Sequence, residues 1–396
     1  MYPSVACECR PKRTGDTVTG FVTGVGLTPF GRQPGLDSVD WQCAAAEAAV
    51  RDAGLPVEQL DTVIAGYSTT AAHLMPANAF AERFGVRPAV AFGMSVGGAT
   101  GLAMVAAAAR LVGTGEARHV LVVAGEDRAS GQTRSASTRV LAQVGHPAYE
   151  VPLGGTVPAY YALLASRYLW MYGLPADALA PLPVQLREHA EHKVGAHFSK
   201  PITVTDVLTS RPVAEPLRLL DCCPVSDGGA AFVVSAAPLG ERSVEIAGVG
   251  QAHRHQHLCA LDPADTGAAQ AAGQALTAAR IGLSDVDVLG VYDSFSVTVA
   301  MLLEEIGVAP PGRAGSYARA GAFEVDGRYP LNTHGGLLSY GHSGVAGGMA
   351  HLAEVVTQIR GERGAAQVRR CRTGYVHADG GVLSAHVGMV LRGGGR

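Results

Sequence analysis

Residues 97–116 read GGATGLAMVAAAARLVGTGE, and residues 343–362 read SGVAGGMAHLAEVVTQIRGE. Both stretches begin with small residues typical of a turn, continue as a helix pattern rich in small apolar residues, and end at a Gly-Glu pair. When the two are aligned, Gly98 falls on Gly344 and Gly101 falls on Gly347, with the same spacing in both pairs. A match of this length indicates an internal duplication of the chain.

The regions before these stretches repeat as well. Residues 20–30 read GFVTGVGLTPF and residues 244–254 read VEIAGVGQAHR, and each is followed by an alanine-rich helix pattern and a short apolar strand. Strands that alternate with helices of this length predict parallel βαβ units. We therefore expect an α/β protein made of two βαβαβ halves, the first spanning residues 17–240 and the second residues 241–396.

One segment of the first half has no counterpart in the second. It runs from about residue 127 to residue 220 and is richer in proline, histidine and tyrosine, and we interpret it as a helical insertion that caps the first half. The first 16 residues are polar and lack the apolar core of a signal peptide. We expect a flexible lead-in there, and a cytoplasmic protein.

The composition argues against several other classes of protein. The chain has 31 basic and 34 acidic residues, so it lacks the basic excess of a nucleic-acid-binding protein. The longest apolar run, residues 99–109, is too short to span a membrane. The seven cysteines show no paired CxxC spacing, which argues against a disulfide scaffold or a zinc site. The low charged fraction, 16%, favours a large buried surface such as that of an oligomer.

Four motifs, in this order, resemble those of the thiolase superfamily. They are AEPLRLLDCCPVSDGGAAFVV at 214–234, VYDSFSVTVAMLLEEIG at 291–307, YPLNTHGG at 329–336 and GHSGVAGGMAHLAEVVTQIRG at 341–361. The resemblance covers about residues 17–396 and is greatest to the sterol-carrier-protein-type branch. It implies a thiolase-like, five-layered αβαβα sandwich, a homodimer, and an acyl-CoA thioester as substrate with no further cofactor. It also implies a small OB-fold, zinc-ribbon protein as a partner.

The chain departs from thiolases at the start of the first duplicated helix. Thiolases carry their nucleophilic cysteine there, whereas this position is Gly98 and the turn GMSVGGATG contains no cysteine. Without a thiolate, the acyl-enzyme route of thiolases is not expected. In this respect the chain resembles the lipid-transfer-protein aldolases of steroid side-chain degradation, while it keeps the longer GH-S-G loop of acetyl-CoA acetyltransferase-like relatives. We expect retro-aldol cleavage of a β-hydroxyacyl-CoA.

Three residues are the catalytic candidates. Tyr292, in VYDSF, matches the histidine of the HDCF motif of sterol-carrier-protein-type thiolases, and the resemblance to the aldolases implies that it takes the proton from a β-hydroxyl. His342 matches the histidine of the family's GHP-type loop and would stabilise the enolate oxygen. His377, in YVHADGG, falls where thiolases place their second cysteine, and either it or Asp379 could carry the second proton.

Glycines at the helix starts are the candidates for substrate binding. Free backbone N–H groups at a helix N-terminus favour anions and developing oxyanions, and glycine lets the backbone approach a thioester closely. The candidates are Gly97, Gly98, Gly344 and Gly381.

Three alternatives remain open. The first is acyl transfer or Claisen-type condensation by a route independent of cysteine, and the second is a non-catalytic scaffold or lipid-binding subunit. The third is a serine hydrolase, because residues 93–97 read GMSVG and match the GxSxG pattern around Ser95. No internal duplication is expected in that class, and a true serine esterase would depend on Ser95.

Overall fold

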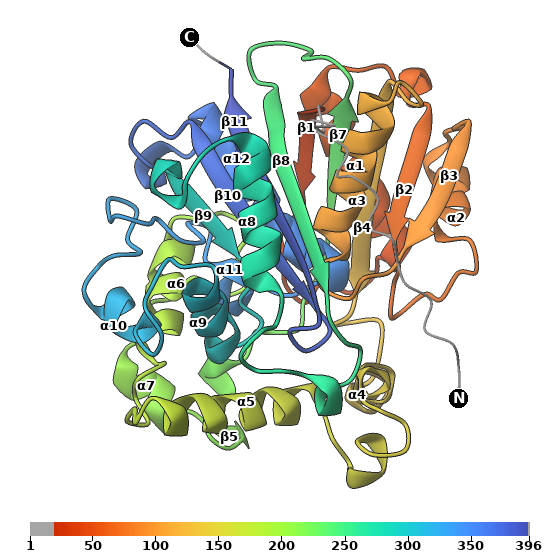
Figure 1. The fold of residues 1–396 in the computed structure, drawn as a ribbon. Coiled ribbons are helices and arrows are strands. Elements are labelled where there is room, and N and C mark those ends of the chain that lie inside the picture. Colours follow the sequence, from red (N-terminus) through yellow and green to blue (C-terminus); the bar gives the residue numbers. More distant parts are fainter. Residues whose placement is uncertain (1–19, 395–396) are drawn as a thin grey trace, which may run out of the picture.

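The computed structural model describes residues 20–394, so the predicted lead-in of residues 1–16 lies outside the described residues. Within that part of the chain, nine strands form one mixed sheet in the order β3-β2-β4-β7-β1-β8-β11-β10-β9 (Figure 1). The strands are β1 (Phe21–Leu27), β2 (Thr62–Gly66), β3 (Val90–Met94), β4 (His119–Asp127), β7 (Asp227–Ser235), β8 (Val244–His253), β9 (Val288–Val291), β10 (Thr373–Gly380) and β11 (Ala385–Gly393).

The strand order reveals the duplication. The first half contributes β3-β2-β4-β7-β1. The second half contributes β8-β11-β10-β9, so that the equivalent strands follow in the reverse order, and no counterpart of β3 is present among residues 20–394. In each half the last strand, β7 or β11, runs antiparallel to both of its neighbours. The halves join where β1 pairs with β8, with Val22 opposite Val244.

The repeated glycines have the same structural role in both halves. A Cβ on Gly26 would lie 2.7 Å from the backbone nitrogen of Ala49 in α1 (Ser38–Ala53). A Cβ on Gly250 would lie 2.8 Å from that of Ala275 in α8 (Ala268–Ala279). Real Cβ atoms do not approach this closely, so glycine is what lets each helix lie directly on its strand.

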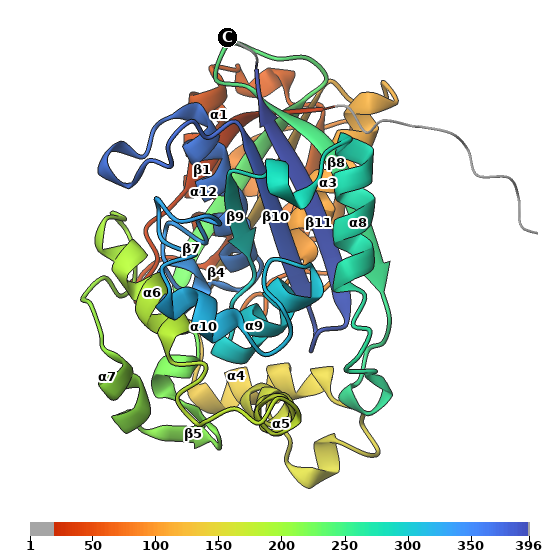
Figure 2. The ribbon, with the colours of Figure 1, turned by 60° about the vertical axis from the view of Figure 1, so that its left-hand side comes forward.

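Helices complete a five-layered αβαβα sandwich. On the outer faces, α1 packs on β1, β7 and β4 of the first half, and α8 packs on β8 and β11 of the second. Between the halves, α3 (Thr100–Gly113) and α12 (Gly344–Arg360) pack against each other and against strands of both halves, as Figures 1 and 2 show. The fold predicted from the duplicated sequence is confirmed.

The segment between β4 and β7 is mainly helical and lies at one end of the sheet (Figures 1 and 2). Its elements are α4 (Arg134–Leu141), α5 (Val157–Met171), α6 (Pro181–Glu191), α7 (Val204–Thr209), β5 (Pro212–Ala214) and β6 (Leu217–Arg218). The remaining helices are α2 (Pro76–Phe84), α9 (Ser296–Glu305), α10 (Ala314–Arg319) and α11 (Gly336–Ser339). Tyr161 of α5 stacks on Phe295, with ring centroids 4.5 Å apart, and so joins this segment to the second half. Among residues 20–394 no helix has both the length and the hydropathy to cross a membrane.

Candidate active site

The two duplicated helices begin next to each other. Gly97 and Gly344 have positive φ angles of 56° and 53°, which side chains of L-residues rarely adopt. A Cβ on Gly348, in the first turns of α12, would lie 2.8 Å from the carbonyl oxygen of Gly98. A Cβ on Gly97 would lie 2.6 Å from the backbone nitrogen of Gly381. Close backbone approach therefore requires glycine at this junction.

Tyr292 lies directly over Gly98. A Cβ at residue 98 would overlap the Tyr292 hydroxyl and would lie 2.6 Å from its Cζ, and it would also lie 2.5 Å from the carbonyl oxygen of Asp379. Tyr292 follows β9, and its backbone N–H donates to the carbonyl of His377 in β10 (3.0 Å). The phenol thus fills the space that a side chain at residue 98 would need.

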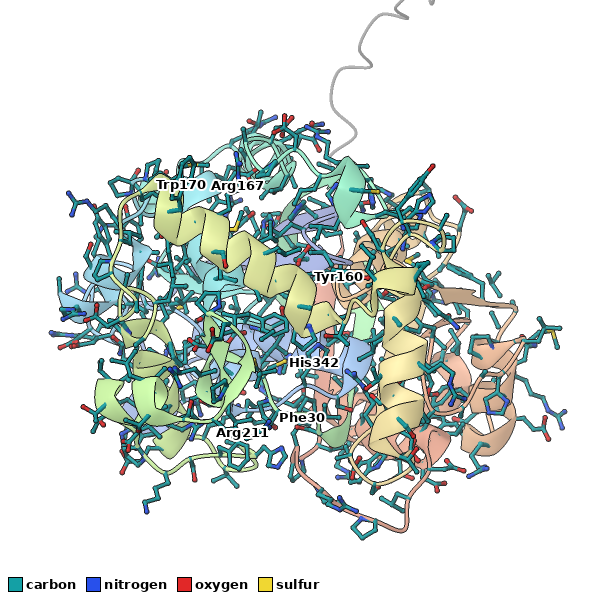
Figure 3. All side chains as sticks on the ribbon, turned by 90° about the horizontal axis from the view of Figure 1, so that it is seen from below. Phe30, Tyr160, Arg167, Trp170, Arg211 and His342 are labelled. Carbon is teal, nitrogen blue, oxygen red and sulfur yellow. The ribbon has the colours of Figure 1, made fainter. Side chains whose placement is uncertain are left out.

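His342 contacts the same phenol. Its Nε2 lies 3.1 Å from the Tyr292 hydroxyl oxygen, and the two rings meet edge to face. The loop between α11 and α12 holds His342 in place, because its backbone N–H donates to the carbonyl of Pro224 (3.0 Å). Tyr292 is only 5% exposed, whereas His342 is partly exposed. In the view from below in Figure 3, His342 is seen in the gap between α4 and α5.

Arg128 completes the contacts of the His342 ring. Its Nη1 lies 3.4 Å from His342 Nδ1. Arg128 follows β4 and is 7% exposed, so the first half of the chain contributes it, with Gly97 and Gly98, to a site whose Tyr292 and His342 come from the second half. Sequence reasoning missed this residue, although a charged residue directly after the carboxyl end of a parallel strand is a recognisable signal.

Burial sets the protonation states of this pair. Burial and, to a lesser extent, the nearby Arg128 charge together lower the pKa of His342 to about 3, so the ring is neutral at pH 7. Burial raises the pKa of Tyr292 well above its ordinary value, and the Cys223 and Asp379 side chains add to this effect while Arg128 opposes it. The free protein therefore holds a neutral imidazole against a protonated phenol.

Asp379, whose backbone carbonyl lies next to Gly98, carries a carboxyl group with a strongly raised pKa. Burial raises its pKa from 3.8 to about 8. The Tyr161 hydroxyl donates to its Oδ2 (2.9 Å), while its Oδ1 has no hydrogen-bond partner among the described residues. A carboxyl group that is protonated near pH 7 can donate a proton, as general acid catalysis requires.

His377 lies on the same strand but has other partners. Its Nδ1 lies 2.7 Å from the Tyr375 hydroxyl and its Nε2 lies 3.1 Å from Nδ1 of His386. Both ring nitrogens are therefore engaged away from Tyr292 and His342, and burial lowers the pKa of His377 well below its ordinary value. The structure brings Tyr292, His342 and the glycines together but leaves the His377 ring outside the group.

The serine-hydrolase arrangement is not formed in the part of the chain that the structure describes. The Ser95 hydroxyl has no hydrogen bond to a histidine or carboxylate among these residues. Asp293, the carboxylate such a triad would use, instead accepts from Nε2 of His351 (2.8 Å) and from the backbone N–H of Leu337 (2.8 Å). Asp293 thereby holds α11 in place. Among residues 20–394 no group of three or more His, Cys, Asp or Glu side chains is arranged to hold a metal ion.

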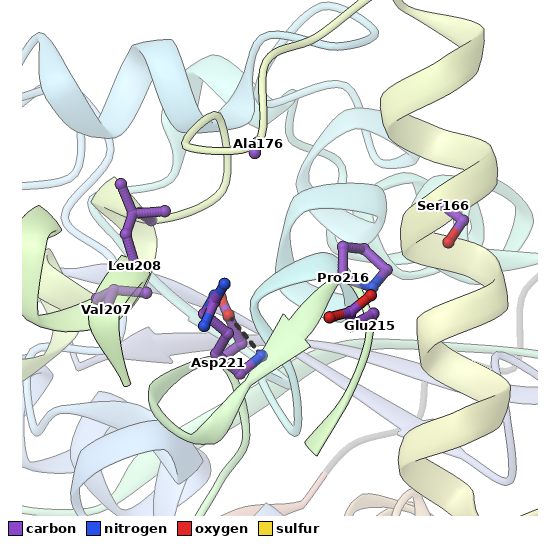
Figure 4. Close-up of a pocket in the computed structure, with 9 residues that line it drawn as sticks. Ser166, Ala176, Val207, Leu208, Glu215, Pro216 and Asp221 are labelled. Carbon is purple, nitrogen blue, oxygen red and sulfur yellow. Dashed lines mark hydrogen bonds between the residues drawn. The ribbon is translucent and has the colours of Figure 1, made fainter. Parts of the chain in front are cut away.

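A separate cavity of about 560 Å³ lies within the capping segment, between α5, α7 and the β5–β6 hairpin (Figure 4). Its wall includes Asp221, which accepts from the backbone N–H of Arg218 (3.0 Å) and from the Ser296 hydroxyl (2.7 Å). Neither Tyr292 nor His342 lines this cavity.

This fold and this arrangement at two paired helix starts are those of a thiolase-fold enzyme. Residues 21–237 match the family model of the thiolase N-terminal domain and residues 250–393 match the thiolase C-terminal domain-like model, so the chain belongs to the thiolase family. It is an aldolase or an acyltransferase of that superfamily, and its relatives bear both kinds of name.

Three relatives illustrate this range. The chain is 33% identical to a 17-hydroxy-3-oxo-4-pregnene-20-carboxyl-CoA lyase of Mycobacterium tuberculosis, over 86% of this chain and 91% of the lyase. It is 29% identical to an acetyl-CoA acetyltransferase of Methanothermobacter thermautotrophicus, over 92% and 98% of the two chains. The solved structure of an "Ltp2-ChsH2(DUF35) aldolase" superposes with a TM-score of 0.81 at 29% identity, covering 95% of this chain and 98% of the other.

Proposed function

We propose that the protein is a lyase that cleaves the Cα–Cβ bond of a β-hydroxyacyl-CoA by a retro-aldol reaction. The observation that carries this proposal is the Tyr292 hydroxyl over Gly98, because a phenol fills the space from which a thiolase cysteine would act. The lyase name of a relative at 33% identity supports the same reaction class.

The chemistry divides among three groups. The reacting form is the one in which Tyr292 has released its proton to solvent while Asp379 keeps its own. The Tyr292 phenolate removes the proton of the β-hydroxyl, the Cα–Cβ bond breaks, and its electron pair passes into the thioester as an enolate. The Nε2–H of His342 stabilises the enolate oxygen, as a fixed donor at a developing oxyanion does. An aldehyde or ketone leaves, and protonated Asp379 supplies a proton to Cα. Proton transfer from Tyr292 to Asp379 then restores the starting state.

The raised pKa of Asp379 suits this cycle. A phenol needs a partner to release its proton, and the negative charge of Asp379 raises the pKa of Tyr292. A negative charge on either group opposes ionisation of the other, so the two are not both ionised near neutral pH, as expected of coupled acids. We assign the second proton transfer to Asp379 rather than to His377, whose ring nitrogens contact Tyr375 and His386.

The proposal is tested by incubating the purified protein with a panel of β-hydroxyacyl-CoA thioesters and measuring both products by mass spectrometry. We expect a shortened acyl-CoA together with an aldehyde or ketone. Tyr292→Phe should lower kcat at least 100-fold, in keeping with the loss of a general base. Turnover that survives in Tyr292→Phe would exclude the base assignment, and no turnover with any thioester, with or without a partner protein, would favour the scaffold alternative.

Acyl transfer is the second candidate, because a relative bears the name acetyl-CoA acetyltransferase. The described thiols nearest the site are poor nucleophiles. Burial raises the pKa of Cys222 to about 12 and that of Cys223 further, so neither is a thiolate at pH 7. Incubation with acetyl-CoA followed by intact-mass analysis would reveal an acyl-enzyme, which the aldolase mechanism does not form.

We further propose two protein contacts. The outer edge of β3 is unpaired and Val90 on it is 43% exposed, so a second copy of the chain could continue the sheet there as a homodimer. The similar aldolase is an Ltp2–ChsH2(DUF35) assembly, which supports the expectation of an OB-fold, zinc-ribbon partner. The panel should therefore be run with and without such a protein.

A further inference from the structure

Arg128 is a buried cation without an ion pair. It is 7% exposed, and among residues 20–394 no carboxylate lies within ion-pair distance of its guanidinium. Its Nε has no hydrogen-bond partner, and the hydrogen bond that the side chain makes is the one to His342 Nδ1. Nearby Glu126 directs its Oε2 to the backbone N–H of Thr69 (3.0 Å) instead. Burying a charge without a partner costs folding free energy, so Arg128 is a candidate for a role at the site.

The direction of this hydrogen bond follows from the chemistry of the two groups. A guanidinium can only donate, so His342 Nδ1 must carry a lone pair and accept. A neutral imidazole with a free Nδ1 carries its proton on Nε2. Nε2 lies 3.1 Å from the Tyr292 oxygen, so the ring donates to that oxygen.

We propose that Arg128 is a positioning residue that fixes His342 in the Nε2–H tautomer, so that the imidazole acts as a hydrogen-bond donor toward Tyr292 and the reacting oxygen. This inference rests on the proposed function for its consequences, but the tautomer itself does not depend on any reaction. Arg128 acts through His342 and does not touch the reacting atoms.

The fixed tautomer decides which way protons move. A donor at Nε2 cannot accept the Tyr292 proton, so that proton must leave toward another acceptor, and the resulting phenolate is stabilised by the N–H. The opposite tautomer would accept a hydrogen bond from the phenol and so favour its protonated form. Without Arg128 both tautomers would be populated, and the oxyanion donor would be present for only part of the time.

Several other groups face Tyr292. The rings of His342 and His351 lie 6.1 Å and 6.2 Å from its ring centroid. The ionisable side chains Cys223, Asp379 and Tyr67 raise its pKa, and the Arg128 charge lowers it. Arg128 therefore favours the phenolate both through the tautomer and through its charge.

The test reads the tautomer directly. The protein is labelled with ¹⁵N-histidine, long-range ¹H–¹⁵N spectra are recorded at pH 7, and the His342 signals are assigned by their loss in His342→Gln. We expect the Nε2–H pattern in the unaltered protein and a mixture of tautomers, or the Nδ1–H pattern, in Arg128→Met. Arg128→Lys, which keeps a donor, should restore the Nε2–H pattern at least in part. The control Arg118→Gln removes an exposed cation at the far end of β4 and should leave the spectrum unchanged.

Kinetics supply the second readout. Arg128→Met should lower kcat about 100-fold while KM changes less than about threefold. It should also move the acidic limb of the pH–rate profile to higher pH. An Nδ1–H pattern in the unaltered protein overturns the proposal, and this result does not depend on whether any variant folds. An unchanged tautomer in Arg128→Met also overturns it, as does a large rise in KM alone, which would mark Arg128 as a direct substrate contact. If the tautomer follows Arg128 but Tyr292→Phe keeps full turnover, the proposed function fails while this inference stands.

Discussion

The hydroxyl of Tyr292 stands where the Cβ of any side chain at residue 98 would have to lie, so Gly98 and Tyr292 are sterically matched. The carbonyl oxygen of Asp379, 2.5 Å from the same point, leaves no room on the other side. Glycine at residue 98 is therefore a requirement of this active site and not only the loss of a nucleophile.

Gly98→Ala should inactivate the enzyme and destabilise it. The added methyl group must displace the phenol or the backbone of β10, which costs about 1–3 kcal/mol of unfolding free energy as overpacking does. Chemical denaturation and kcat measure the two effects. Gly273→Ala is the control, because nothing lies within 4 Å of its Cβ in α8, and it should gain about 0.5–1 kcal/mol. Full activity in Gly98→Ala would contradict the steric match.

The sequence predicts the fold well because duplication leaves visible marks. Gly26 and Gly250 recur where a helix lies on a strand, and Gly98 and Gly344 recur at the helix starts. The contacts between the capping segment and the site could not be predicted from the sequence. The position of Arg128 directly after a strand marks it as a candidate, but its partner His342, and the contact of Tyr161 with Asp379, result from long-range packing and emerge only from the structure.

Asp379→Asn should change how stability depends on pH. Burial raises the pKa of this carboxyl from 3.8 to about 8, so the folded protein holds a proton that the unfolded chain has released. The stability that this provides is complete below pH 3.8 and is lost as the pH rises through about 8. From pH 6 to pH 9 the unaltered protein should lose about 1–3 kcal/mol more unfolding free energy than Asp379→Asn. Denaturation curves at both pH values measure this.

The control for that experiment is Asp326→Asn, which removes an exposed carboxylate. It should follow the unaltered protein at both pH values. Parallel pH dependence of the unaltered protein and Asp379→Asn would mean that Asp379 is ionised in the fold, and the proposed acid role would then fail as well.

His377→Gln should separate the two candidates for the second proton transfer. The substitution weakens the contacts with Tyr375 and His386, and leaving a buried polar group unpaired costs about 1–3 kcal/mol. We expect kcat to change less than threefold in the folded protein, whereas Asp379→Asn should lower kcat about 100-fold. The reverse pattern, a large loss of kcat in His377→Gln at unchanged stability, would return the role to His377.

Val90→Lys should weaken the proposed homodimer. A lysine on an edge strand opposes pairing with a second edge, because its charge would be buried between the strands. Light scattering after size exclusion should show a shift toward monomer over a dilution series. Val90→Thr keeps a branched side chain suited to a strand and should remain dimeric. Identical masses for both variants would place the dimer contact elsewhere.

Tyr161→Phe should move the alkaline limb of the pH–rate profile. The Tyr161 hydroxyl donates to Asp379 and so lowers the pKa of that carboxyl, opposing burial. Removing the hydroxyl should raise the pKa, so that Asp379 stays protonated, and kcat persists, to about 1 pH unit higher. Tyr168→Phe is a matched control on the same helix, since its hydroxyl donates to Glu304 (2.6 Å) and not to Asp379. A limb that moves to lower pH, or that moves equally in both variants, would contradict the proposed effect of the Tyr161 hydroxyl on the pKa of Asp379.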